Sequence, residues 1–134
     1  QQIVILGQSM GTGVAIWLAQ KNPSAGLVLQ SPYTSIVDMA GLQMPFIPAN
    51  LLLKDRFDSL SRIGNITVPI GWIHSKNDEL IPIAMGQKLF AAARSRKCKL
   101  TLQVGGHNDM NSSAVADFVR RNARSMVSAG NCSV

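Results

Sequence analysis

Four short apolar runs alternate with segments of helical periodicity along the chain. Runs of this length, separated by helical segments, are typical of parallel strands joined by crossover helices. The pattern therefore predicts an α/β protein with a mostly parallel sheet of about four strands and helices on both faces. The predicted strands are Gln2 to Leu6, Gly26 to Gln30, Val68 to His74 and Lys99 to Val104.

Three helices are predicted from the spacing of apolar residues between and after these strands. The first follows the first strand and ends before Pro23, the second begins at Pro82, and the third follows Asn111. Each has its inward-facing residues on one stripe. These are Met10, Val14, Trp17 and Leu18 in the first helix, Met85, Leu89 and Ala93 in the second, and Val115, Phe118, Val119, the polar Asn122 and Met126 in the third.

The stretch from residue 32 to residue 64 is too long for a simple connection. Pro45 and Pro48 divide it into short helical pieces. Two interpretations stay open: a cap that gives an active site an apolar pocket, or an ordinary crossover helix buried on the sheet. Its apolar residues are Met39, Leu42, Met44, Phe46, Ile47, Leu51, Leu52 and Leu53.

Composition places the whole chain, residues 1–134, in one domain. With 46% hydrophobic and 15% charged residues it has enough apolar side chains for one core. No apolar run reaches the roughly eighteen residues of a membrane span. Cys98 and Cys132 are too few to suggest a disulfide framework, and their spacing matches no metal site.

The net charge of +6 has two interpretations. It could attract an anionic membrane surface or substrate, or it could mark the solvated edges of two surface helices, which we favour. Basic residues are not interleaved with aromatic ones, so we expect no nucleic-acid partner.

The sequence Gly7-Gln8-Ser9-Met10-Gly11 lies between the first predicted strand and the first predicted helix. A serine at such a turn, with glycine two residues to either side, is the pattern of a nucleophile elbow. We expect a strained backbone at Ser9, and we expect that a Cβ at Gly7 or Gly11 would clash with neighbouring backbone. The Met10 amide would be one donor to an oxyanion.

A nucleophilic serine needs a histidine base and an acid that orients it. His107 lies in a glycine-flanked loop just beyond the last strand, whereas His74 ends the third strand and is expected to be a structural hydrogen-bonding residue. Asp78 follows the third strand, with Glu79 as its adjacent competitor. Ser9, Asp78 and His107 each follow a strand, in the order of an α/β hydrolase.

With these residues placed, the chain resembles the C-terminal half of an α/β-hydrolase-domain serine hydrolase. It is similar to the branch that groups Bem46-like proteins with protein depalmitoylases and monoglyceride lipases. Ser75 stands where this family usually has glycine. The matching segments are Leu6 to Gly13, Gln30 to Ser35, Ile73 to Pro82 and Gly105 to Asp109.

The resemblance implies that Ser9 is the nucleophile, Asp78 the acid and His107 the base, with no metal or organic cofactor. It also implies that the chain is part of a longer hydrolase, whose missing N-terminal half supplies the second oxyanion donor. We expect hydrolysis of an ester or thioester of an acyl or lipid-type substrate. A serine peptidase is the first alternative, and an inactive fragment or interaction module is the second. An intracellular or membrane-associated location is weakly favoured.

Overall fold

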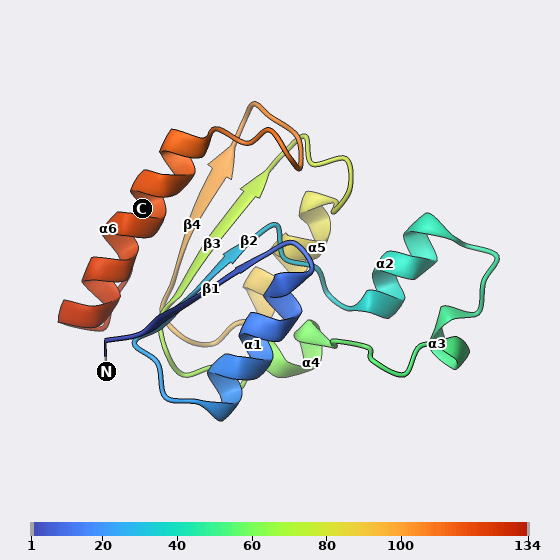
Figure 1. The fold of residues 1–134 in the computed structure, drawn as a ribbon, viewed down its shortest axis with the longest axis horizontal. Helices are drawn as coiled ribbons and strands as arrows, with labels where there is room; N and C mark the ends of the chain where they lie inside the picture. The colour runs from blue at the N-terminus through green and yellow to red at the C-terminus, as the bar shows by residue number, and fades with distance from the viewer. Residues whose placement is uncertain (1, 134) are drawn as a thin grey trace.

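The computed structural model describes residues 2–133 and contains a four-stranded parallel sheet (Figure 1). The strands lie in sequence order, β1-β2-β3-β4. This arrangement confirms the predicted α/β class, the number of strands and their parallel direction. The strands are β1 (Val4–Gln8), β2 (Gly26–Gln30), β3 (Ile70–Ser75) and β4 (Lys97–Leu102).

The strand boundaries follow backbone pairing rather than hydropathy. β2 has the predicted bounds, but β1 begins and ends two residues later than predicted, because Gln8 still pairs with Gln30 of β2. β4 begins two residues earlier, where Lys97 pairs with Ile70. The Lys97 ammonium donates to the carbonyl oxygens of Phe90 and Ala93, at 2.7 Å each. Polar residues can therefore extend a strand wherever the ladder and side-chain partners satisfy them.

Helices cover both faces of the sheet, as predicted (Figure 1). Helices α1 (Gly11–Lys21), α4 (Ser59–Ile63) and α5 (Ile83–Ala92) pack over one core, and α6 (Ser112–Ala129) packs over the other. None of the helices between residues 2 and 133 combines the length and apolar character needed to cross a bilayer. The first core contains Ile16, Leu27, Leu29, Ile63, Ile70 and Leu89, and the second contains Val28, Ile73, Leu102, Met110, Phe118 and Met126.

The buried face of α1 differs from its most apolar stripe. Thr12, Gly13, Ala15 and Ile16 are buried, whereas the predicted apolar stripe is exposed. Thr12 and Ala15 lie so close to Gly7 of β1 that a Cβ there would meet both, so a larger side chain at these two positions of α1 would not fit. The exposed residues of the stripe are Met10, Val14, Trp17 and Leu18.

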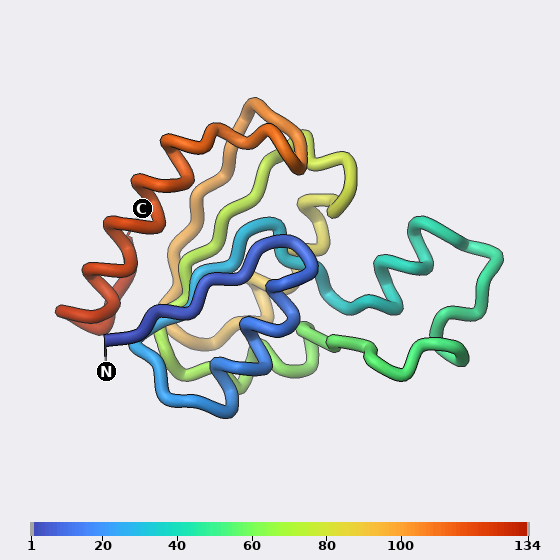
Figure 2. Tube along the Cα trace, viewed as in Figure 1, coloured from blue at the N-terminus to red at the C-terminus, as the bar shows by residue number. Residues whose placement is uncertain are grey.

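Residues 36–53, which we call the arm, extend away from the sheet (Figure 2). The arm consists of α2 (Ile36–Gln43), the proline-containing loop and α3 (Ala49–Leu52). Phe46 at its tip is 98% exposed and Leu51 is 79% exposed. The prolines interrupt the helices as expected. Within residues 32–64, α4 contributes Ile63 to the first core, whereas α2 has no buried residue.

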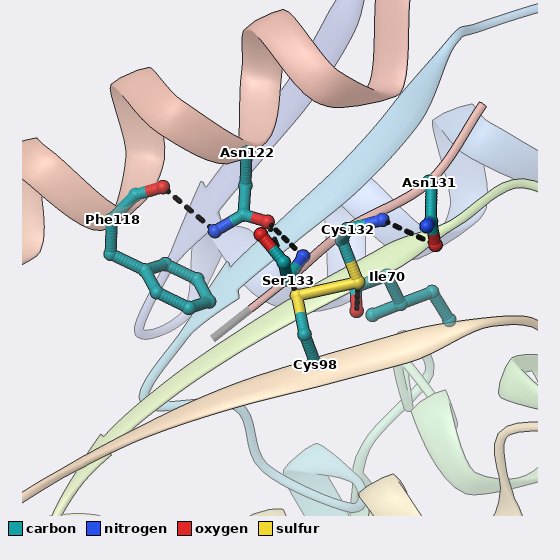
Figure 3. The surroundings of a disulfide bond; sticks show 7 residues. All are labelled: Ile70, Cys98, Phe118, Asn122, Asn131, Cys132 and Ser133. Carbon is teal, nitrogen blue, oxygen red and sulfur yellow. Dashed lines mark hydrogen bonds between the residues drawn. A yellow bond between two sulfur atoms is a disulfide. The ribbon is translucent and has the colours of Figure 1, made fainter. Parts of the chain in front are cut away.

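A disulfide joins Cys98 of β4 to Cys132, just beyond α6 (Figure 3). Sequence analysis found no reason to pair these cysteines. The tail is also held by the Ser133 N–H, which donates to the Asn122 side-chain oxygen at 2.8 Å. Asn122 in turn donates to the Phe118 carbonyl oxygen at 3.0 Å. The disulfide therefore closes a loop that contains the whole of α6.

We predict that the Cys132→Ser variant is less stable than the wild type under oxidising conditions. The bond joins cysteines 34 positions apart, and loop-closure entropy for such a loop corresponds to about 4 kcal/mol. Thermal unfolding should show a lower Tm for the variant. A dithiol reductant should lower the wild-type Tm to a similar value and leave the variant unchanged; equal Tm values in all four samples would contradict the prediction.

Candidate active site

Three loops meet at the carboxyl-terminal edge of the sheet and bring Ser9, Asp78 and His107 together. Ser9 follows β1, Asp78 follows β3, and His107 lies in the loop between β4 and α6. Because the strands are parallel, their carboxyl ends lie along one edge, where α/β sheets usually hold their sites. The strand order therefore determines which loops meet.

Ser9 has the left-handed backbone expected of the elbow, with φ at 52°. This conformation costs energy in a residue with a side chain, so the surrounding structure must hold it. The Ser9 N–H donates to the Gln30 carbonyl oxygen at 2.8 Å. The Ser9 carbonyl oxygen accepts from the Thr12 N–H at 3.0 Å and from the Thr12 hydroxyl at 2.7 Å. The turn is thus anchored to β2 and to the first turn of α1.

The two glycines of the elbow have different surroundings. A Cβ at Gly7 would lie 2.6 Å from the Ala15 Cβ and 2.8 Å from the Thr12 Cα, so the predicted clash is confirmed there. A Cβ at Gly11 would meet nothing within 4 Å, so the prediction of a clash at Gly11 is wrong. Gly11 is the first residue of α1, and a side chain at this position would extend into open space.

The His107 ring connects the serine hydroxyl with the aspartate. Its Nε2 lies 2.8 Å from the Ser9 Oγ, and its Nδ1 lies 2.9 Å and 3.0 Å from the two carboxylate oxygens of Asp78. An ionised carboxylate only accepts, so the proton belongs on Nδ1 and leaves Nε2 free to accept from the Ser9 hydroxyl. His107 and Asp78 are 6% and 7% exposed.

The carboxylate of Asp78 is well supplied with donors. Its Oδ1 accepts from the Leu80 N–H at 3.1 Å and the Ile81 N–H at 2.8 Å. Burial raises the pKa of Asp78, but hydrogen bonds from Ile81 and His107 outweigh it, so the pKa lies below its usual value. The carboxyl is therefore ionised at neutral pH.

The loops that carry Asp78 and His107 are also joined by hydrogen bonds between side chains of one loop and backbone groups of the other. The Ser75 hydroxyl donates to the Gly105 carbonyl oxygen, and the Asn77 amide donates to the Gln103 carbonyl oxygen at 3.0 Å. Glu79, the competing acid, accepts from the His107 backbone N–H at 3.0 Å rather than from its ring. The serine that replaces the family's glycine thus binds the histidine loop.

Other candidate residues have supporting positions. His74 is a structural hydrogen-bonding residue, as predicted, with Nε2 2.8 Å from the Ile81 carbonyl oxygen. The Met10 N–H has no acceptor within residues 2–133. Tyr33 was not predicted to belong to the site, but its hydroxyl donates to the Met10 carbonyl oxygen at 3.1 Å. The sequence signal that could have indicated this role is its position in the segment Gln30 to Ser35, which matches the family.

A cavity of about 450 Å³ lies beside His107, between the free side of β1 and α6. Most of its surface is apolar. The residues described contain no cluster of side chains suited to a metal ion. The cavity is lined by Leu6, Gln8, Gln30, His107, Asn108, Met110, Ser112, Val115, Ala116 and Val119.

No protein-family model matches the chain, but curated proteins do. It is 33% identical over 123 residues to an uncharacterized protein of Mycobacterium tuberculosis, covering 90% of this chain and 44% of that protein. It is 32% identical over 111 residues to human alpha/beta hydrolase domain-containing protein 17B, covering 82% of this chain and 37% of that protein. The chain thus spans less than half the length of these relatives.

Solved structures share the fold at low sequence identity. Acetyl xylan esterase 1 from Thermoanaerobacterium matches 95% of this chain and 46% of its own, with a TM-score of 0.73 and 16% identity. Monoacylglycerol lipase from Paleococcus ferrophilus matches 96% and 69%, with a TM-score of 0.64 and 15% identity. Acylaminoacyl peptidase from Pyrococcus horikoshii matches 80% and 20%, with a TM-score of 0.66 and 15% identity.

We predict that alanine is tolerated at Gly11 but not at Gly7. A methyl group at Gly7 would overlap Ala15 and Thr12, and such overpacking costs about 1–3 kcal/mol or more. At Gly11 it would meet open space. Urea denaturation of the two single variants measures the difference, and equal losses in both would contradict this account of the elbow.

Proposed function

The chain belongs to the α/β-hydrolase family, and from this premise we propose that it is the catalytic part of a serine hydrolase that cleaves esters or thioesters. The observation that carries the proposal is the continuous series of hydrogen bonds from Ser9 through His107 to Asp78. Such a series lets an alcohol act as a nucleophile at neutral pH.

In the proposed reaction the Ser9 Oγ attacks the acyl carbonyl carbon and its proton passes to Nε2 of His107. Asp78 stabilises the imidazolium through Nδ1, and the Met10 N–H donates to the oxyanion. The intermediate then collapses, the C–O or C–S bond breaks, and the leaving alcohol or thiol takes the proton from Nε2. Water repeats these steps on the acyl-enzyme, releasing the carboxylic acid and restoring Ser9. No metal or organic cofactor enters this scheme.

An acyl or lipid-type substrate is supported by the apolar surface near the site. Leu6, Met110, Val115 and Val119 line the cavity beside His107, and an acyl chain there would remove apolar area from water. The exposed apolar side chains of the arm fit a cap over the substrate or contact with a membrane surface.

We also propose that an upstream segment of the full-length protein pairs with β1. Within residues 2–133, β1 pairs only with β2, and apolar side chains of α1 are exposed beside it. An unpaired apolar edge favours strand addition. A loop preceding such a strand could bring the second oxyanion donor to Ser9.

Two other functions compete with this proposal. A serine peptidase would use the same three residues, and one structural neighbour is an acylaminoacyl peptidase. An inactive fragment or interaction module would keep the fold without turnover. Assays of the full-length protein with acyl p-nitrophenyl esters and with peptide substrates separate the three, since peptide cleavage alone favours the peptidase and no turnover favours the module.

We predict that Ser9→Ala abolishes ester hydrolysis and labelling by a fluorophosphonate probe in the full-length protein. Both depend on the Ser9 Oγ as nucleophile. Ser128→Ala is the matched control, because Ser128 is exposed on α6, where its hydroxyl donates to the Arg124 carbonyl oxygen at 2.9 Å. If Ser9→Ala keeps wild-type turnover while folded, the proposed nucleophile is wrong.

We predict that Asp78→Asn lowers kcat by about 10³- to 10⁴-fold, because a neutral amide does not stabilise the imidazolium. Steady-state ester hydrolysis by the full-length protein measures this change.

The lowered pKa of Asp78 also predicts a change in stability with pH. The carboxylate contributes stability above its unfolded pKa, and this contribution is lost as pH falls through the lower folded value. The free energy of unfolding, measured by urea denaturation at a series of pH values from neutral to acid, should therefore fall more steeply with decreasing pH for the wild type than for Asp78→Asn.

A further inference from the structure

A second imidazole lies against the aspartate of the site. His74, near the end of β3, is completely buried. Its Nε2 lies 2.8 Å from the Ile81 carbonyl oxygen and 3.4 Å from the Asp78 Oδ2. The reaction proposed above does not use this ring, so its place beside the acid calls for a separate explanation.

The contacts of His74 determine its tautomer. A carbonyl oxygen only accepts hydrogen bonds, so the Nε2 that faces Ile81 must carry the proton. The same N–H is directed to the side of the ring where Oδ2 of Asp78 lies. The Nδ1 of His74 has no partner among the described residues, which suits a nitrogen without a proton in an apolar setting.

The His74 ring has little room to move. A Cβ at Gly86 of α5 would lie 2.4 Å from the His74 Nδ1 and 2.8 Å from the Trp72 Cζ2. The Trp72 ring packs against the His74 ring with centroids 5.4 Å apart. The glycine of α5 and the tryptophan of β3 therefore fix the orientation in which Nε2 faces the acid.

The charge state of His74 matters because two imidazoles face one carboxylate. Burial lowers the pKa of His74, the hydrogen bond to Ile81 and the charge of Asp78 raise it less, and a charge on His107 lowers it further. The ring is therefore neutral at neutral pH. Asp78 and His107 are the titratable groups that act on it, and Gly86, Trp72 and Phe90 bring no charge.

We propose that His74 is a positioning residue that holds the turn of Asp78 so that its carboxylate faces His107. Ile81 is bound from two sides, since its N–H donates to Oδ1 of Asp78 and its carbonyl oxygen accepts from His74. The turn from Asp78 to Ile81 is thereby anchored to β3. For catalysis the inference rests on the proposed serine hydrolase, whereas the geometry itself can be tested without turnover.

The test compares His74→Gln and His74→Leu in the full-length protein. A glutamine amide can place an N–H close to the position of Nε2, whereas leucine keeps apolar bulk without a donor. Ile73→Val is the matched structural control. Ile73 is fully buried in the core on the opposite face of β3. The shorter valine side chain therefore removes packing contacts from that core and does not affect the Asp78 turn.

We expect His74→Leu to lower kcat/KM by about 10- to 100-fold through misplacement of the acid. The NMR resonance of the His107 Nδ1 proton, which is donated to Asp78, should move upfield or broaden because the carboxylate is less well held. His74→Gln should recover most of the lost kcat/KM and most of the wild-type position of this resonance. Ile73→Val should lower Tm while leaving the His107 Nδ1 proton resonance and kcat/KM unchanged. The wild-type NMR spectrum should show His74 neutral with its proton on Nε2.

An unchanged His107 Nδ1 proton resonance in a folded His74→Leu variant would overturn the proposal, as would a glutamine variant no better than the leucine variant. If the leucine variant does not fold, the wild-type tautomer and the glutamine variant decide, and a proton on Nδ1 of His74 refutes the inference. If the wild type has no hydrolase activity but the His107 Nδ1 proton resonance responds to substitution of His74, the proposed function fails and the positioning role remains.

Discussion

The contact between Asp78 and the His107 ring is the interaction on which the site depends. These residues come from different loops, and they meet because β3 and β4 are adjacent, parallel and in register, with His74 paired to Thr101 and Ser75 to Leu102. A shift of the register by one residue would turn each side chain of the moved strand to the opposite face. The hydrogen bonds of Ser75, Asn77 and Glu79 to the histidine loop support the same alignment.

The sequence was enough to predict what depends on local pattern and strand order. The four strands, the helices α1, α5 and α6, the strained backbone of Ser9 and the structural role of His74 were all predicted from it. The features that depend on three-dimensional packing were not predicted from the sequence. The crowding expected at Gly11 is absent, because α1 turns that position toward open space, and the apolar stripe of α1 lies outside. Hydropathy reports which residues avoid water, but not which face of a helix meets the sheet.

The disulfide shows another limit of sequence reasoning. Two cysteines separated by a strand end, a loop and a long helix carry no local signal of pairing; only the packing of α6 back along the sheet brings Cys132 to Cys98. Such bonds persist in oxidising compartments, whereas cytosolic glutathione keeps thiols reduced.

Because each strand pairs with the one made before it, the sheet can grow in the order in which the ribosome makes the chain. Among the four described strands, none has to insert between two others. Ser9 follows the first of these strands and His107 follows the fourth, so Ser9 is made before His107. The hydrogen bond between the Ser9 hydroxyl and the His107 ring can therefore form only after the loop beyond β4 has been made.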